Sequence, residues 1–253
     1  MQTPSICELV SVWEWGLTKH PVQRALKLLT TAFPQTPLDT LAQLSIGQRD
    51  AYLLTLRELV FGPKLVSLAS CPHCGERLEL AFDVADIMVE GMHLLPEPKL
   101  QETFSVDVGD CQVQFRLPNS LDIADLVSHN NIADSEQFLL ERCVLAVHNH
   151  CKQTTDELRA DIPSIRDAIV RHMAEVDPQA DMQFNLVCPS CNHQWQVLFD
   201  ILLFFWQEID AWAYRILREV HTLASAYGWH EADILGMNPH RRQFYLQLIT
   251  SKN

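Results

Sequence analysis

The feature that most constrains the fold is a short internal repeat built on two Cys-Pro-x-Cys motifs. Cys71-Pro-His-Cys74 precedes a segment of alternating apolar residues that ends in Phe82-Asp83. Cys188-Pro-Ser-Cys191 precedes a similar segment that ends in Phe199-Asp200, and seven residues separate the second cysteine from the Phe-Asp pair in both copies. The repeat predicts two equivalent cysteine turns, each leading into a β-strand.

Two C-x2-C turns carry the four soft ligands that a tetrahedral zinc ion prefers. We therefore predict a structural zinc site formed by Cys71, Cys74, Cys188 and Cys191. The strands after the two turns, residues 77–82 and 194–199, are expected to pair with each other, which makes the site a split zinc ribbon. The long insertion between the halves is tolerable because the entropic cost of closing a loop grows only logarithmically with its length.

Other uses of these cysteines remain as alternatives. Cys-Pro-His-Cys also occurs in oxidising thioredoxin-like proteins, but there the first cysteine opens a helix, whereas Gly75 and a strand pattern follow here. The pairs could also sit apart as plain core cysteines. His73 or His193 could replace a cysteine ligand, as catalytic zinc would favour, but surface histidines are expected. The remaining cysteines, Cys7, Cys111, Cys143 and Cys151, show no ligand spacing and are predicted to be buried small hydrophobic residues.

Composition narrows the class of function. The 19 Lys and Arg residues against 32 Asp and Glu residues give a formal charge of −13, which disfavours nucleic acid and anionic membranes as partners. No signal peptide or membrane span is recognised, so we expect a protein in the cytoplasm of the producing cell. Phosphate-binding, hydrolase-elbow and zinc-protease motifs are missing, and no enzymatic activity is predicted. The segment His148–Cys151 is expected to be a polar loop, and Arg241-Arg242 a solvated helix face.

The predicted fold class is α+β and mainly helical, with a split zinc-ribbon-like β element interrupted by an inserted α/β segment and with a long C-terminal helix. The expected parts are a helical region at 1–66, the two ribbon halves at 67–91 and 182–200, an insertion at 92–181 and a helical region at 201–253. Within them the sequence predicts a capping box at Ser45–Gln48, a hairpin at Thr103–Leu117, helices at 121–128, 135–147 and 162–175, a helix at Ile201–Tyr227, and a last helix capped by Asn238.

The long helix at Ile201–Tyr227 carries apolar residues around most of its circumference, more than one buried face requires. The excess must be covered by the chain's own core or by a partner. The candidate partner-binding residues are Phe204, Phe205, Trp206, Trp212, Tyr214 and, beyond the helix, Trp229.

Several segments resemble one known family over most of the chain, from about residue 40 to the end. They are 44–50 (LSIGQRD), 56–63 (LRELVFGP), 71–78 (CPHCGERL), 177–181 (DPQAD), 188–191 (CPSC), 199–201 (FDI), 219–229 (EVHTLASAYGW), 233–235 (DIL) and 241–246 (RRQFYL). These segments are similar to the long-form members of the T-even-phage baseplate hub assembly chaperone family. Such members are encoded with contractile phage tails and with related phage-tail-like injection systems.

The resemblance implies a non-enzymatic role in building the baseplate hub. The expected partners are hub, spike or wedge proteins of a contractile tail, met in the cytoplasm of the producing bacterium. A transient chaperone and a permanent component of the particle are both compatible with it, and a zinc-ribbon nucleic-acid-binding protein is a further alternative. The zinc prediction itself rests on the cysteine spacing and not on the resemblance.

Overall fold

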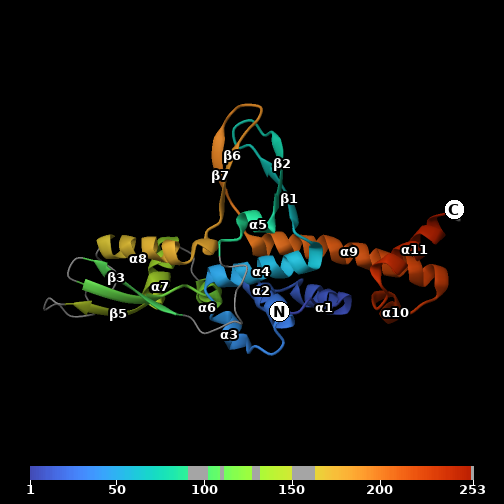
Figure 1. Cartoon of the computed structure of the whole chain (residues 1–253), viewed down its shortest axis with the longest axis horizontal. Coiled ribbons are helices and arrows are strands. Elements are labelled where there is room, and N and C mark those ends of the chain that lie inside the picture. The colour runs from blue at the N-terminus through green and yellow to red at the C-terminus, as the bar shows by residue number, and fades with distance from the viewer. Residues whose placement is uncertain (91–101, 109–110, 127–131, 150–162, 252–253) are drawn as a thin grey trace. The chain divides into compact units, whose positions relative to one another are not determined.

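The computed structural model describes residues 1–90, 102–108, 111–126, 132–149 and 163–251 (Figure 1). The helices are α1 (Ile6–Gly16), α2 (Pro21–Ala32), α3 (Leu38–Ala42), α4 (Ile46–Phe61), α5 (Val84–Ile87), α6 (Ser120–Leu126), α7 (Ile132–Cys143), α8 (Pro163–Val176), α9 (Ile201–Tyr227), α10 (Glu231–Leu235) and α11 (Pro239–Thr250), with a short 3-10 helix η2 (Pro178–Ala180). The strands are β1 (Lys64–Ser70), β2 (Arg77–Asp83), β3 (Thr103–Val108), β4 (Cys111–Arg116), β5 (Val144–Asn149), β6 (Gln183–Val187) and β7 (Gln194–Leu198). The mixed, mainly helical class and the long C-terminal helix are as predicted.

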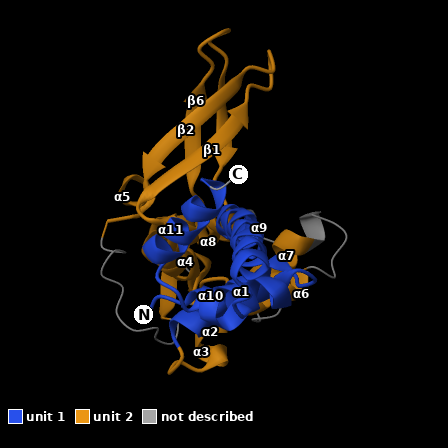
Figure 2. Ribbon diagram, turned by 90° about the vertical axis from the view of Figure 1, so that its right-hand side faces the viewer, with its two compact units in different colours: residues 1–33, 202–253 blue, residues 34–201 orange. Residues whose placement is uncertain are grey.

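The chain forms two compact units, residues 1–33 with 202–253 and residues 34–201 (Figure 2). In the first unit, α9, α10 and α1 enclose a core formed by Val10, Ile216, Val220, Leu223, Ile234 and Leu235. The indole N–H of Trp13 donates a 2.8 Å hydrogen bond to Asp210 and so ties α1 to α9. Asn238 caps α11, as predicted, by accepting a hydrogen bond from the backbone N–H of His240.

One prediction for this unit is wrong. Arg242 is buried and donates a 2.8 Å hydrogen bond to Glu219 of α9, whereas its neighbour Arg241 is exposed as expected. Adjacent helix residues point in different directions, and here Arg242 faces α9 while Arg241 faces solvent.

The second unit is organised around α4. Its predicted capping box is present, because the Ser45 hydroxyl accepts a hydrogen bond from Gln48 N–H and the Gln48 side chain accepts one from Ser45 N–H. In the first turn of α4, Gly47 N–H donates a 3.0 Å hydrogen bond to the carboxylate of Asp177, at the start of η2. A side chain at position 47 would collide with that carboxylate. Glycine is therefore required where the two elements meet.

A largely buried carboxyl group on α4, that of Asp50, should make the stability of the fold depend on pH. Burial raises the pKa of Asp50 to about 6, and the negative charges of Asp200 and Asp177 act in the same direction. The positive charge of Arg49, whose Nε lies 2.7 Å from Asp50 Oδ1, opposes this shift. A carboxyl group with a raised pKa in the folded state stabilises the fold below its unfolded pKa and loses that contribution as pH rises through about 6. Between pH 5 and 7.5 we expect the wild type to lose about 1 kcal/mol of unfolding free energy relative to Asp50→Asn. Urea unfolding of both proteins at several pH values measures this difference, and parallel pH profiles would contradict it.

The insertion contains a three-stranded antiparallel sheet in the order β3-β4-β5, covered by α8. The β3-β4 hairpin is confirmed, and its predicted turn at 109–110 lies outside the described residues. The prediction of helix through residue 147 is wrong beyond Cys143, where β5 begins and pairs with β4. Val144 and Val147 are β-branched and are buried with Val113 and Phe115 of β4, so sheet packing prevails over local helical spacing.

The two cysteine turns close two separate hairpins, β1-β2 and β6-β7 (Figure 1). The expected pairing of the strands that follow the turns is therefore wrong: β2 pairs with β1, and β7 pairs with β6. The preceding strands are joined to them by short turns, so they pair at a smaller entropic cost. The hairpins meet instead through side chains, with Phe82 4.8 Å from Phe184 and 5.7 Å from Phe199 between ring centroids.

None of the helices in the described part of the chain combines the length and the apolar character needed to cross a membrane.

Candidate metal centre

Each cysteine turn has the same backbone geometry. The Cys71 N–H donates a hydrogen bond to the carbonyl of Glu76, and the Cys71 carbonyl accepts one from the Gly75 N–H. Cys188 makes the same two bonds with His193 and Asn192. Gly75 and Asn192, at equivalent positions of the repeat, both adopt the left-handed backbone conformation that glycine and asparagine tolerate best (φ 78° and 54°).

The two turns bring four sulfur atoms together. All four Sγ atoms of Cys71, Cys74, Cys188 and Cys191 lie within 4.8 Å of one another. Cys71 and Cys191 are 3.7 Å apart and Cys74 and Cys188 3.5 Å apart, measured between Sγ atoms. A tetrahedral zinc ion with Zn–S bonds of ~2.3 Å requires S···S separations of roughly 3.8 Å, so the residues fit such an ion. All four cysteines are free thiols, and neither turn contains a disulfide.

The electrostatics of the cluster also favour a cation. Burial opposes ionisation of Cys71, but backbone N–H groups of Cys74 and His73 and the neighbouring thiols lower its pKa to about 7. The backbone of Glu76 lowers the pKa of Cys74, whereas the thiols of Cys191, Cys188 and Cys71 together with burial raise it to about 12. Several thiolates so close together repel one another unless a metal ion compensates their charge.

The neighbouring histidines lie outside the cluster. His73 and His193 stack on each other with ring centroids 5.6 Å apart, and His193 also stacks on Trp195. Within the described residues, the metal-ligand group consists of the four cysteines alone. This arrangement offers a closed set of sulfur ligands, without the open position that catalytic zinc sites keep.

A family model described as T4 bacteriophage base plate protein matches residues 18–206. The chain belongs to this family. Both cysteine turns lie inside the matched region, while the segments quoted above from 219 to 246 lie beyond it. No curated protein and no solved structure matches the chain. Membership indicates a role in the baseplate and association with other baseplate proteins.

The other cysteines of this baseplate protein show mixed environments. Cys143 is buried as predicted, and burial raises its pKa to about 11 against the effect of the Arg116 guanidinium. Cys111 is half-buried. The prediction is wrong for Cys7, which is exposed near the start of α1, where an amphipathic helix presents its outer face. Cys151 lies outside the described residues, as does His150, and His148 is an exposed residue of β5 instead of a loop residue.

The aromatic residues predicted to face a partner are largely engaged within the chain. Phe205 and Trp206 are buried, which corrects the prediction for both. The guanidinium carbon of Arg24 lies 4.4 Å from the centroid of the Trp206 ring, and Gly16 lies against the same ring. Trp206 is therefore covered by α1 and α2. Phe204, Trp212 and Trp229 are half-buried, and Trp229 stacks on Tyr227. Tyr214 is half exposed and packs edge-on against Trp13. Of the residues that were predicted to form this surface, Tyr214 alone is exposed, and Phe204, Trp212 and Trp229 are partly exposed.

A different exposed apolar surface was missed. On the outer faces of the two hairpins, Val66 and Leu68 of β1 and Val187 and Leu198 of β6-β7 are all more than half exposed. The signal was present in the sequence, because β1 carries apolar residues on both faces, Leu65 and Ala69 on one and Val66 and Leu68 on the other. A strand with apolar residues on both faces usually has a second surface to cover.

Proposed function

We propose that this protein is a non-enzymatic assembly factor for the baseplate hub of a contractile phage tail or a phage-tail-like injection system. The observation that carries the proposal is the baseplate family match over residues 18–206, which spans most of the chain and both cysteine turns. The partners are hub, spike or wedge proteins, which the factor meets in the cytoplasm of the producing bacterium.

We further propose that the four cysteines bind one structural zinc ion and that the two hairpins form a split zinc-ribbon-like element around it. Sulfur separations of 3.5 and 3.7 Å support this assignment, as does the absence of a non-sulfur ligand from the cluster of described residues. The zinc holds the ends of the two hairpins together and performs no chemistry.

The charge distribution indicates what kind of partner surface fits. Residues 34–201 contain 11 Lys and Arg against 25 Asp and Glu, a formal charge of −14, and the rest of the chain is close to neutral. A partner of this unit gains from a basic surface, and association should weaken as salt is added. The same charge disfavours the nucleic-acid-binding alternative.

Co-expression of the tagged chain with each hub, spike and wedge subunit tests the proposal. We expect one or more subunits to co-purify in stoichiometric amounts at low salt. A chain that co-purifies with none of them would refute the assembly role. Purified mature particles then separate the two fates: a transient chaperone is missing from them, whereas a permanent component is present at fixed stoichiometry.

A further inference from the structure

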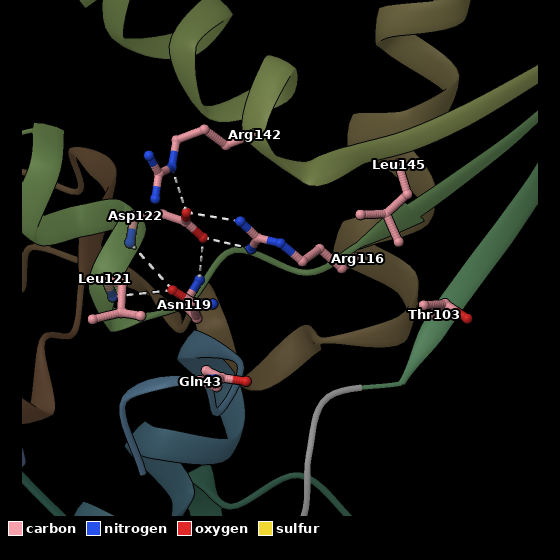
Figure 3. A pocket seen from close by; sticks show the side chains of 8 residues that line it. All are labelled: Gln43, Thr103, Arg116, Asn119, Leu121, Asp122, Arg142 and Leu145. Atoms are coloured by element: carbon pink, nitrogen blue, oxygen red, sulfur yellow. Dashed lines mark hydrogen bonds and ion pairs between the residues drawn. The ribbon is translucent and has the colours of Figure 1, made fainter. Parts of the chain in front are cut away.

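A second site lies in the inserted α/β segment, away from the cysteine cluster. A pocket of about 420 Å³ is lined by Gln43, Thr103, Arg116, Asn119, Leu121, Asp122, Arg142 and Leu145 (Figure 3). These residues come from the end of α3, from β3, β4 and β5, and from α6 and α7, so the pocket is formed by long-range packing. Its volume is within the range of ~300–1,000 Å³ typical of ligand sites.

Among the charged groups that line the pocket, only hydrogen-bond donors remain available to a ligand, because the one carboxylate is already engaged. Asp122 is completely buried, and its Oδ1 accepts hydrogen bonds from Arg116 and Arg142 at 2.9 and 2.7 Å. Its Oδ2 accepts from Arg116 and from the backbone N–H of Asn119. The carboxylate is therefore saturated, while two guanidinium groups, each with five N–H donors, surround it.

Asn119 supplies an unused donor. Its Oδ1 accepts hydrogen bonds from the backbone N–H groups of Leu121 and Asp122, and the side chain is thereby fixed. The residue is only 5% exposed. No hydrogen bond of its Nδ2 group is found within the described part of the chain, and Asn119 is one of the residues that line the pocket (Figure 3). Ser120 Oγ is the one fully buried side-chain polar atom without a partner among the described residues, so the Asn119 Nδ2 group is accessible at the pocket and can donate to a ligand that enters it.

We propose that this pocket binds a carboxylate attached to an apolar group, as presented by an apolar C-terminal residue of a partner chain. Asn119 Nδ2 and the guanidinium groups of Arg116 and Arg142 donate to the carboxylate. The apolar group lies against Leu121 and Leu145, which are 43% and 42% exposed at the pocket. A monoanion is favoured over a phosphate because residues 34–201 carry a net charge of −14, which repels a dianion more strongly.

The assignment of the carboxylate to a chain terminus rests on the proposed assembly function, whereas the chemistry of the pocket does not. A small carboxylic acid presents the same groups, so the experiment must distinguish the two sources. The full-length chain is titrated with acetyl-Gly-Leu, with the same dipeptide as its C-terminal amide, and with 4-methylpentanoate. Calorimetry gives the affinities, and the NMR signals of the Asn119 side-chain amide locate the site.

We expect the dipeptide acid to bind roughly tenfold more tightly than the amide, because hydrogen bonds to a charged acceptor are about twice as strong. We also expect it to bind more tightly than 4-methylpentanoate, and to shift the Asn119 amide signals. Equal affinities for acid and amide would overturn the pocket assignment. Tighter binding of 4-methylpentanoate would overturn the chain-terminus assignment.

Two variants with opposite expected effects complete the test. Asn119→Asp keeps the oxygen that accepts from Leu121 and Asp122 but replaces the free donor with a negative charge, and should abolish binding of the dipeptide acid. Asp125→Asn removes the exposed carboxylate that lies 3.1 Å from Nη1 of Arg142, and should tighten binding severalfold. Unchanged affinity for the dipeptide acid in either variant would refute the proposal. If Asn119→Asp does not fold, the affinity of Asp125→Asn alone tests the proposal. Loss of subunit co-purification with intact dipeptide binding would instead count against the assembly function.

Discussion

Replacing Cys188 with serine should remove the metal from the protein and release the two hairpins from each other. Cys188 is fully buried, and its Sγ lies 3.5 Å from that of Cys74 on the other hairpin. Structural zinc contributes ~10–16 kcal/mol of binding free energy in zinc-finger peptides, and much of it acts as folding free energy. We expect zinc content to fall from one ion per chain to near zero and thermal unfolding to begin at a much lower temperature. Elemental analysis and calorimetry measure the two effects.

Cys7→Ser is the matched control, because Cys7 is an exposed thiol in the other unit of the chain. It should keep a full zinc complement and wild-type unfolding. Chelation of the wild type should reproduce the Cys188→Ser phenotype, and added zinc should reverse it. A Cys188→Ser protein that still holds one zinc ion per chain would show that the four sulfurs do not form a single site.

Short-range sequence patterns predicted the elements of this fold well. The cysteine spacing placed Cys71, Cys74, Cys188 and Cys191 in one cluster, although more than a hundred residues separate the pairs. The Ser45 capping box and the Asn238 cap were predictable because a cap depends on residues within one helical turn. The alternation of Leu78, Leu80 and Phe82 likewise depends only on the period of a strand.

Features that depend on long-range packing were not predictable. Nothing local to Trp206 indicates that the chain itself covers it, since Gly16 and Arg24 are far away in sequence. The strand at Val144–Asn149 exists because β4 lies beside it. Likewise, β2 pairs with β1 and not with β7, and the sequence of β2 alone does not distinguish these two partners. The pocket around Asn119 joins segments from residue 43 to residue 145, and no single segment carries its signature.

Asp122→Ala should cost the second unit about 3–5 kcal/mol of unfolding free energy. The Asp122 carboxylate joins three elements, because it accepts hydrogen bonds from Arg116 at the end of β4 and from Arg142 at the end of α7, and itself belongs to α6. The substitution leaves two arginine side chains, 21% exposed for Arg116 and 36% exposed for Arg142, without their common partner. Urea unfolding of the two proteins at neutral pH measures the loss.

Asp125→Ala is the control that separates the effect of burial from the effect of losing a negative charge beside Arg142. Asp125 also pairs with Arg142, at 3.1 Å, but its side chain is 55% exposed. Solvent screens such a pair, so we expect a cost of ~0–1 kcal/mol. Equal effects of the two substitutions would show that the buried network does not stabilise the fold.

The pH dependence of Asp122→Ala identifies the charge as the cause. Burial alone would raise the pKa of Asp122, but hydrogen bonds from Arg116, Arg142 and the backbone of Asn119 hold it below its usual value. A carboxyl group with a lowered pKa in the folded state contributes its stability above the unfolded pKa, about 4, and loses it as pH falls through the folded value. The difference between the wild type and Asp122→Ala should therefore be constant from pH 8 to about 5 and shrink below about 4. A difference that persists undiminished in acid would mean that lost packing, and not the ionised carboxylate, explains the destabilisation.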